Sequence, residues 1–323
     1  MKKGLLTSLA CLLLITVFNF ALPRLMPGDT VLMLVGMDEA QVSEQEYAFY
    51  LEKTGADRPL PEQFGDYLFG ILTGDLGYSY HHNAPVGRLI RERLPATLSI
   101  AVPAVVLSAG ISLVLGCLMG MKRGSAAESA VTAVQIVADA IPAFLLALLL
   151  ILLFSFQLGW LPMGQLASLR VPEGPLAALL DRTLHLILPV ATLVIGAVPG
   201  KYLMVCGTVA RQRNEKYVLN ARSRGLSDAR IAFCHILPNI CQPFVAMVGM
   251  NVGFLVSGSL VIETIFSIKG MGSLLSAAIT ARDYPVLQGC LFVSALVVVA
   301  ANLVTDAVCV LLDPKVRCRV HEA

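Results

Sequence analysis

Six long apolar windows constrain the fold of this chain more than any other feature of its sequence. They cover residues 4–22, 94–121, 130–156, 185–209, 237–262 and 286–312. An α-helix rises about 1.5 Å per residue, so about 20 apolar residues cross the roughly 30 Å hydrocarbon core of a bilayer. A composition of 56% hydrophobic and 14% charged residues does not fit a soluble surface. We therefore predict an all-α integral membrane protein with about six transmembrane helices.

Lysine and arginine fall mainly on one side of these predicted helices. The basic residues of that side are Lys2, Lys3, Lys122, Arg123, Arg211, Arg213, Lys216, Arg222, Arg224, Arg230, Lys315, Arg317 and Arg319. The opposite side carries a long segment, 23–93, in which acidic residues outnumber basic ones. Cytoplasmic loops of membrane proteins are enriched in Lys and Arg. Both termini are therefore predicted to be cytoplasmic, and segment 23–93 external.

These assignments divide the chain into three regions. Residues 1–22 form the first transmembrane helix, residues 23–93 an external loop region, and residues 94–323 a five-helix core with a cytoplasmic loop at about 210–239. A basic start followed by an apolar stretch is also typical of a secretory signal peptide. The first window is longer than the apolar region of such a peptide, and no small-x-small cleavage site follows it. We therefore interpret it as a membrane span.

The sequence holds no recognisable catalytic motif. Its nearest approach to a P-loop, segment 196–202, is one residue short between the glycines and has Tyr where Ser or Thr would hold magnesium. No His-Glu-x-x-His, nucleophile elbow or Cys-x-x-Cys pair occurs. The eight cysteines lie in or beside spans or on the cytoplasmic side, which favours reduced thiols over disulfides. We expect no enzyme activity, cofactor, metal site or nucleic-acid partner, and interpret the adjacent His81 and His82 as incidental.

Two acidic residues lie inside apolar windows. Asp139 falls in the third window and Asp306 in the sixth. A carboxylate is costly in hydrocarbon, so each should face the bundle interior, a water-filled path or a polar partner. Two roles remain open for both residues: a hydrogen bond that packs two helices together, or a contact with a substrate in a pore.

The segment 215–239, between the fourth and fifth windows, is interpreted as two short helices that meet at a corner. Residues 215–224 are good helix formers, and Gly225 can adopt the left-handed conformation that ends a helix. Ser227 can cap the next helix, and Asp228 lies in its first turn, near the positive end of the helix dipole. We expect this segment to form a compact knob at the cytoplasmic face.

Two interpretations of the knob are open. In the first, its arginines lie against the anionic head groups of membrane lipid. In the second, the knob is a docking element: the small residues Ala221, Ser223 and Gly225 leave room for the surface of another protein, and the surrounding arginines form ion pairs at the rim.

A residue pattern of Tyr-Val, Ala-x-x-x-Gly-Leu-Ser and His-x-Leu-x-Asn runs through the knob. The matching residues are Tyr217, Val218, Ala221, Gly225, Leu226, Ser227, His235, Leu237 and Asn239. This pattern resembles the coupling loop of ABC importer permeases in the dipeptide, oligopeptide and nickel permease family. The resemblance implies that these residues, together with Arg222, couple the chain to an ATPase.

Further blocks that resemble this family follow in order along the chain. They are Pro27-Gly28-Asp29, Gly74-Asp75-Leu76-Gly77, Arg93-Leu94-Pro95-Ala96, Ile141-Pro142-x-Phe144, Glu263-Thr264-x-Phe266, Gly270-Met271-Gly272, Arg282-Asp283-Tyr284-Pro285 and Asp313-Pro314-Lys315. The chain departs from the family at Thr30 and Lys269, where proline is usual. Both positions lie outside the predicted spans and affect substrate delivery at most.

The resemblance implies the type I transmembrane-domain fold of ABC importers and a heteromeric complex in a bacterial plasma (inner) membrane. The partners would be a second homologous permease subunit, two cytoplasmic ABC ATPase subunits that hydrolyse ATP, and an external solute-binding protein. The cargo would be a di- or oligopeptide, nickel or a metal chelate. An ATPase-independent secondary transporter or channel is the alternative.

Overall fold

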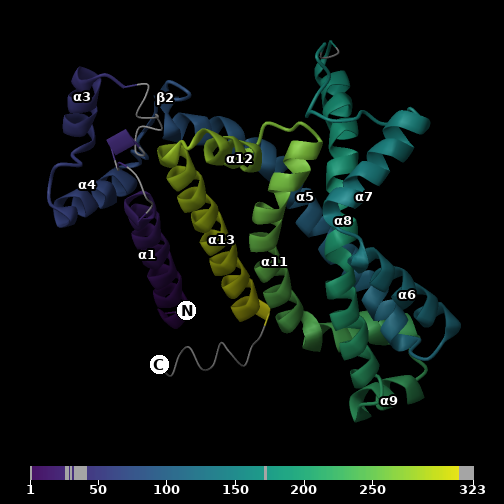
Figure 1. Cartoon of the computed structure of the whole chain (residues 1–323). Helices are drawn as coiled ribbons and strands as arrows, with labels where there is room; N and C mark the ends of the chain where they lie inside the picture. The colour runs from purple at the N-terminus through teal and green to yellow at the C-terminus, as the bar shows by residue number, and fades with distance from the viewer. Residues whose placement is uncertain (1, 26–28, 30, 33–41, 171–172, 313–323) are drawn as a thin grey trace. The chain divides into compact units, whose positions relative to one another are not determined.

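Helices build almost all of the described chain. The computed structural model describes residues 2–25, 29, 31–32, 42–170 and 173–312 (Figure 1). The longer elements are α1 (Lys2–Leu25), α3 (Glu44–Thr54), α4 (Leu60–Thr73), α5 (Val86–Met121), α6 (Ala126–Ala140), α7 (Ala143–Leu150), α8 (Pro175–Gln212), α9 (Lys216–Ser223), α11 (Leu237–Ile265), α12 (Met271–Ala281) and α13 (Tyr284–Leu312). The short ones are strands β1 (Tyr78–Ser79) and β2 (Ala84–Pro85), π-helices η2 (Ile151–Gln157) and η3 (Ala232–Ile236), and α10 (Asp228–Ile231).

Some of the sequence predictions fall outside these described residues. They concern Pro27, Gly28, Thr30, the 313–315 block and the basic C-terminal residues. The chain as a whole divides into two compact units. One contains Leu98–Ser267 and the chain from Ala301, and the other contains Lys2–Thr97 and Ile268–Ala300.

Five described helical segments are long and apolar enough to cross a membrane. They are Leu6–Leu25, Val86–Met121, Pro175–Gln212, Asp228–Gly253 and Tyr284–Leu311. They correspond to five of the six predicted windows, and several extend well beyond them: α5 has 36 residues and α8 has 38. A helix continues past an apolar window wherever its backbone hydrogen bonds remain satisfied, so hydropathy locates a span better than it locates the ends of the helix.

The third predicted span is not one straight helix. α6 and the α7–η2 segment meet at an angle of 102°, and the pair is either a broken span or a re-entrant loop. Pro142 causes the break, because it has no backbone N–H and excludes the preceding residue from the helical region. Ile141 is accordingly extended, with φ −85° and ψ 119°. The window 130–156 therefore contains two helical limbs, and they form the sixth span if the bent pair crosses the membrane as one.

Glycines allow two helices of the first unit to pack closely. A Cβ atom added to Gly116 of α5 would lie 2.6 Å from Cβ of Val205 on α8, and one added to Gly120 would lie 2.7 Å from Cβ of Val209. These distances are shorter than real Cβ contacts allow, so only glycine permits this approach. α5 and α8 therefore pack with their backbones close together, as Gly-x-x-x-Gly pairs do in membrane helices.

The second unit gives structure to much of the segment predicted as an external loop. α3 begins with a capping box in which Ser43 and Glu46 satisfy each other's backbone N–H groups. The β1–β2 hairpin pairs Tyr78 with Pro85 and Ser79 with Ala84. Helices and a hairpin therefore occupy much of residues 44–85, where the sequence analysis expected only a loop region.

The hairpin of the second unit is fixed to the start of α13. The Ser79 hydroxyl donates a hydrogen bond to the Asp283 carboxylate, and both residues are buried. The other carboxylate oxygen of Asp283 accepts a hydrogen bond from the backbone N–H of Val286 at 3.3 Å. Beneath them lies a buried apolar cluster: Val86, Ile90, Met271, Leu274, Ala278, Val286 and Cys290.

Candidate functional site

The corner between α9 and α10 has the geometry that its sequence predicts. Gly225 has φ +78°. Its N–H donates to the carbonyl of Arg222 at 3.0 Å, and the N–H of Leu226 donates to the carbonyl of Ala221 at 3.4 Å. This pair of bonds is the Schellman arrangement, which satisfies the last carbonyls of a helix through a left-handed residue. The corner is therefore closed by its own backbone.

The second limb of the corner is also capped locally. The Ser227 hydroxyl accepts a hydrogen bond from the backbone N–H of Arg230 at 3.4 Å. α10 leads through η3 into α11, so the helical segment from Asp228 to Gly253 is one candidate span. The second limb of the knob is thus continuous with a candidate membrane helix.

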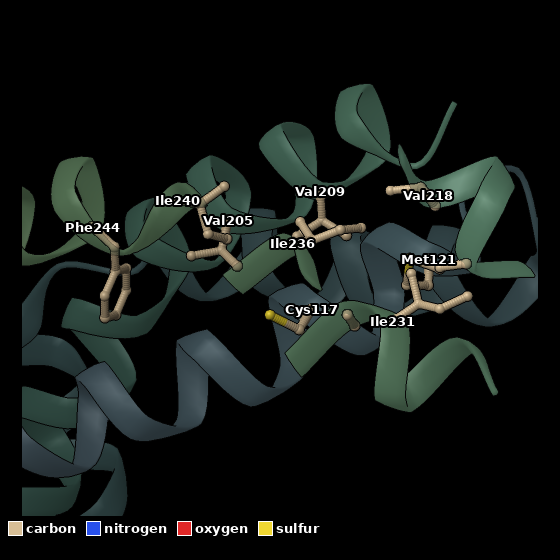
Figure 2. Packing of buried hydrophobic residues seen from close by; sticks show 11 residues of the cluster. Cys117, Met121, Val205, Val209, Val218, Ile231, Ile236, Ile240 and Phe244 are labelled. Carbon is tan, nitrogen blue, oxygen red and sulfur yellow. The ribbon is translucent and has the colours of Figure 1, made fainter. Parts of the chain in front are cut away.

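The inner side of the knob rests on a buried apolar cluster, here called the base cluster. Its members are Cys117, Met121, Val205, Val209, Val218, Ala221, Ile231, Ala232, Ile236, Ile240 and Phe244 (Figure 2). They come from α5, α8, α9, α10, η3 and α11. Ile231 and Ile236 have no exposed surface. The knob is therefore fixed against three long helices at one place.

One sequence prediction about the knob is wrong: the Ala221 side chain faces inward, not outward. Ala221 was expected to leave room for another protein, but its side chain lies in the base cluster and is only 5% exposed. Val218 and Ala221 are three residues apart on α9, so they share the inward face of that helix. The small side chain of Ala221 therefore serves close packing within the chain, while Ser223 and Gly225 are exposed.

The outer side of the knob is exposed and basic. Arg222 donates to the carboxylate of Asp228 at 2.9 Å, across the corner, and both side chains are about half exposed. Arg224 and Arg230 are exposed as well. A Cβ atom added to Gly225 would meet no atom within 4 Å. The surface around the corner is therefore open to a partner.

The remaining predicted coupling residues lie around the two ends of the knob. Tyr217 is exposed, and its hydroxyl donates to the side chain of Gln212 at 2.8 Å. Leu226 and Leu237 are partly buried against the base cluster. The Asn239 amide donates to the carbonyl of His235 at 3.1 Å. The pattern residues therefore divide between an exposed corner and the entry into α11.

Asp139 and Asp306 do not lie in the interior of the described chain. Asp139 is in the last turn of α6, just before the break, and Asp306 is in α13. Both side chains are exposed. Of the three surroundings expected for them, a water-filled path and a polar partner outside this chain remain.

Sequence reasoning missed two buried ionisable residues near the knob. Lys201 lies inside the fourth apolar window and is 1% exposed; its ammonium donates to Ser108 Oγ at 3.1 Å and to the carbonyl of Ala197 at 2.8 Å. Glu128 of α6 is 5% exposed and accepts a hydrogen bond from Arg123 at 2.7 Å. A single charge in an apolar window was the available signal for Lys201.

Residues 112–317 match the family described as the binding-protein-dependent transport system inner membrane component. Residues 1–101 match the N-terminal part of such membrane components. The chain belongs to this family. It is therefore a multi-pass inner membrane protein, and the resemblance found in the sequence is confirmed.

Relatives of known name agree over most of the chain. The chain is 34% identical over 319 residues to the di/tripeptide transport system permease protein DppB of Pseudomonas aeruginosa, covering 94% of each. It is 30% identical over 322 residues to the dipeptide transport system permease protein DppB of Escherichia coli, again covering 94% of each. A probable peptide ABC transporter permease of Sinorhizobium fredii is 30% identical, with 98% of each chain covered.

The fold is also similar to a solved ABC importer. An inward-facing structure of the MetNI methionine ABC transporter aligns with a TM-score of 0.52 and 15% sequence identity, covering 70% of this chain and 96% of that one. At this identity the likeness establishes the fold alone. The type I transmembrane-domain fold is thus confirmed.

Proposed function

We propose that this chain is the permease subunit of an ABC importer that carries di- or oligopeptides. The observation that carries the proposal is the exposed corner at Gly225, seated on a base cluster shared with three long helices. Family membership and the names of the relatives supply the class of transporter and of cargo. The chain itself performs no covalent chemistry in this proposal.

The knob is where a partner ATPase acts on the chain. Its exposed face has an open backbone at Gly225 and basic side chains around it, which suit an approaching acidic protein surface. The base cluster joins it to α5 through Cys117, to α8 through Val209 and to α11 through Ile240. Because packed apolar cores are stiff, a push on the corner is passed to all three helices.

The complete importer contains more than this chain. A second homologous permease completes the path, two cytoplasmic ATPase subunits bind and hydrolyse ATP, and an external solute-binding protein delivers cargo. Both termini and the knob lie in the cytoplasm, and segment 23–93 lies outside, as the distribution of basic residues indicates. ATP-driven closure of the ATPases displaces the knob and rocks the permeases between inward-open and outward-open states.

Peptide is preferred to nickel as the cargo. The relatives cited above are named for peptides. Within the described residues, no group of three or more His, Cys, Asp or Glu side chains is placed to hold a metal ion. His81 and His82 are both exposed, with ring centroids 5.1 Å apart. A metal chelate carried by the binding protein is the second candidate cargo.

Two measurements test this function. Cells with and without the gene are compared for uptake of labelled dialanine and of labelled nickel; the proposal predicts loss of dialanine uptake alone. The protein is also purified under mild conditions with its partners, and an ATP-hydrolysing subunit is expected to co-purify. Solute movement along an ion gradient by the purified chain alone would instead support an ATPase-independent transporter.

A further inference from the structure

A polar stripe runs along one face of α6. Glu128, Thr132, Gln135 and Asp139 are separated by four, three and four residues. Residues at these intervals lie on the same side of an α-helix. Most of the other residues of α6 are alanine, valine or isoleucine. The stripe is therefore a polar line on an otherwise apolar membrane segment.

At the first end of the stripe, which we call its closed end, the polar side chains have partners within the chain. Arg123 donates to Glu128 at 2.7 Å, and Thr132 donates to the same carboxylate at 3.2 Å. The Thr132 hydroxyl is also 2.8 Å from the hydroxyl of Tyr202 on α8. α6 packs against α8 along this part. Glu128 is consequently buried, and its charge is compensated within the chain.

Exposure of the stripe increases toward its other end. Thr132 and Gln135 are partly buried, and Asp139 is exposed. Within the residues that the structure describes, the ion pairs of unit one involve Arg123, His185 and Arg222, and none involves Asp139. A carboxylate facing hydrocarbon is costly. The Asp139 side chain is therefore suited to a water-filled path or to a cation from outside this chain.

The backbone around Asp139 also favours a cation. The carbonyl ends of a helix carry partial negative charge. The helix is interrupted here by a bend of 102°, and Pro142 has no N–H to offer to the last carbonyls of α6. The Ile141 N–H reaches only the carbonyl of Ala138, at 3.3 Å. A carboxylate and a negative helix end thus coincide at the break.

We propose that Asp139, with the carbonyl end of α6, binds the α-ammonium group of the transported peptide inside the translocation path. This inference rests on the proposed function, since it takes a peptide as cargo. Every peptide with a free N-terminus carries this group, so one fixed carboxylate serves cargoes with different side chains. Charge-assisted hydrogen bonds to an ammonium group are among the stronger polar contacts.

Uptake by the complete importer tests this role. Asp139→Asn is expected to lower uptake at saturating dialanine about tenfold, at unchanged half-saturation, because delivery by the binding protein precedes the contact. Asp139→Glu should restore most of the rate. Asp306→Asn, which neutralises the other acid found inside a predicted apolar window, is the matched control and should change uptake less than twofold. Equal uptake by wild type and Asp139→Asn would overturn the proposal.

A labelling experiment separates the proposal from a structural role and from failed insertion. In the purified complex, Gln135→Cys, one turn before the intact Asp139 on the same face of α6, is treated with a cationic methanethiosulfonate reagent, and modification at position 135 is read by mass spectrometry. Labelling should be slowed severalfold by dialanine and not by N-acetyldialanine, which lacks the ammonium. No labelling, as a contact with the second permease would give, or equal protection by both peptides would overturn it. Absence of dialanine uptake by the wild type would instead refute the proposed function.

Discussion

The α9–α10 corner and the α6–α7 break are both places where a helix of the first unit stops, yet they end differently. At the corner, Gly225 and Leu226 close the carbonyl end of α9, Ser227 caps α10, and a buried cluster lies beneath. At the break, the N-cap residue of α7 is Pro142, which makes no side-chain cap, and Asp139 is exposed three residues before it. The end of α9 is satisfied by groups of this chain, whereas Asp139 at the break makes no ion pair among the described residues. We infer that the corner transmits force and the break receives a ligand.

If the corner is held in place by contacts within this chain, the base cluster should contribute most to its stability. Ile236→Ala removes a fully buried side chain and is expected to lower the free energy of unfolding by about 2–5 kcal/mol. Chemical denaturation of the purified protein in detergent measures this. Leu219→Ala, on the same knob at a side chain that is 51% exposed, is the control and should change it by less than about 0.5 kcal/mol. Similar values for the two variants would mean that the knob is not anchored as described.

At the first end of the α6 stripe, we expect removal of Arg123 and neutralisation of Glu128 to lower the free energy of unfolding by different amounts. Arg123→Ala leaves a carboxylate that is 7% exposed without its cation and should cost about 2–3 kcal/mol of unfolding free energy. Glu128→Gln removes the buried charge itself and should cost about 1 kcal/mol. Arg224→Ala, at an exposed arginine, is the control and should be near zero. The reverse order of the first two variants would show that the pair does not hold this end of α6.

The smallest effects are expected at the tip of the corner. Ser227→Ala removes the cap of α10 and should cost about 1 kcal/mol. Asp228→Asn breaks an exposed ion pair with Arg222 and should cost about 0.2–1 kcal/mol. Salt should diminish the second effect and leave the first unchanged, because salt screens exposed charges. A larger, salt-independent effect at Asp228 would contradict the view that the tip is held mainly by its backbone.

The sequence predicts the corner well because its signals are local. A glycine that takes φ +78° and a serine two residues later determine the turn without help from distant residues. The inward orientation of the Ala221 side chain was not predicted, because it depends on which face of α9 packs against α5 and α8. The short spacing to Val218 was the available clue.

The third span and the ionisable residues near it were harder to predict. Pro142 marks the break in the sequence, but the angle of 102° depends on how the two limbs pack. Lys201 was missed because the mean hydropathy of a long apolar window changes little when it contains one charged residue. The capping box at Ser43 and Glu46 would have indicated a helix in the external segment. Hydropathy therefore finds the spans, and tertiary packing decides their bends and buried charges.

The most direct test of the coupling role compares two glycines with the same backbone restraint. Gly225 and Gly159 have φ of +78° and +63°, and a Cβ atom added to either meets nothing within 4 Å. Valine carries a similar strain at both positions, about 1–2 kcal/mol, but only Gly225 lies on the knob. The measurement is peptide-dependent ATP hydrolysis by the importer assembled with its partners. We predict that Gly225→Val inserts normally and loses this activity while Gly159→Val retains it; unchanged coupling in Gly225→Val would contradict the account.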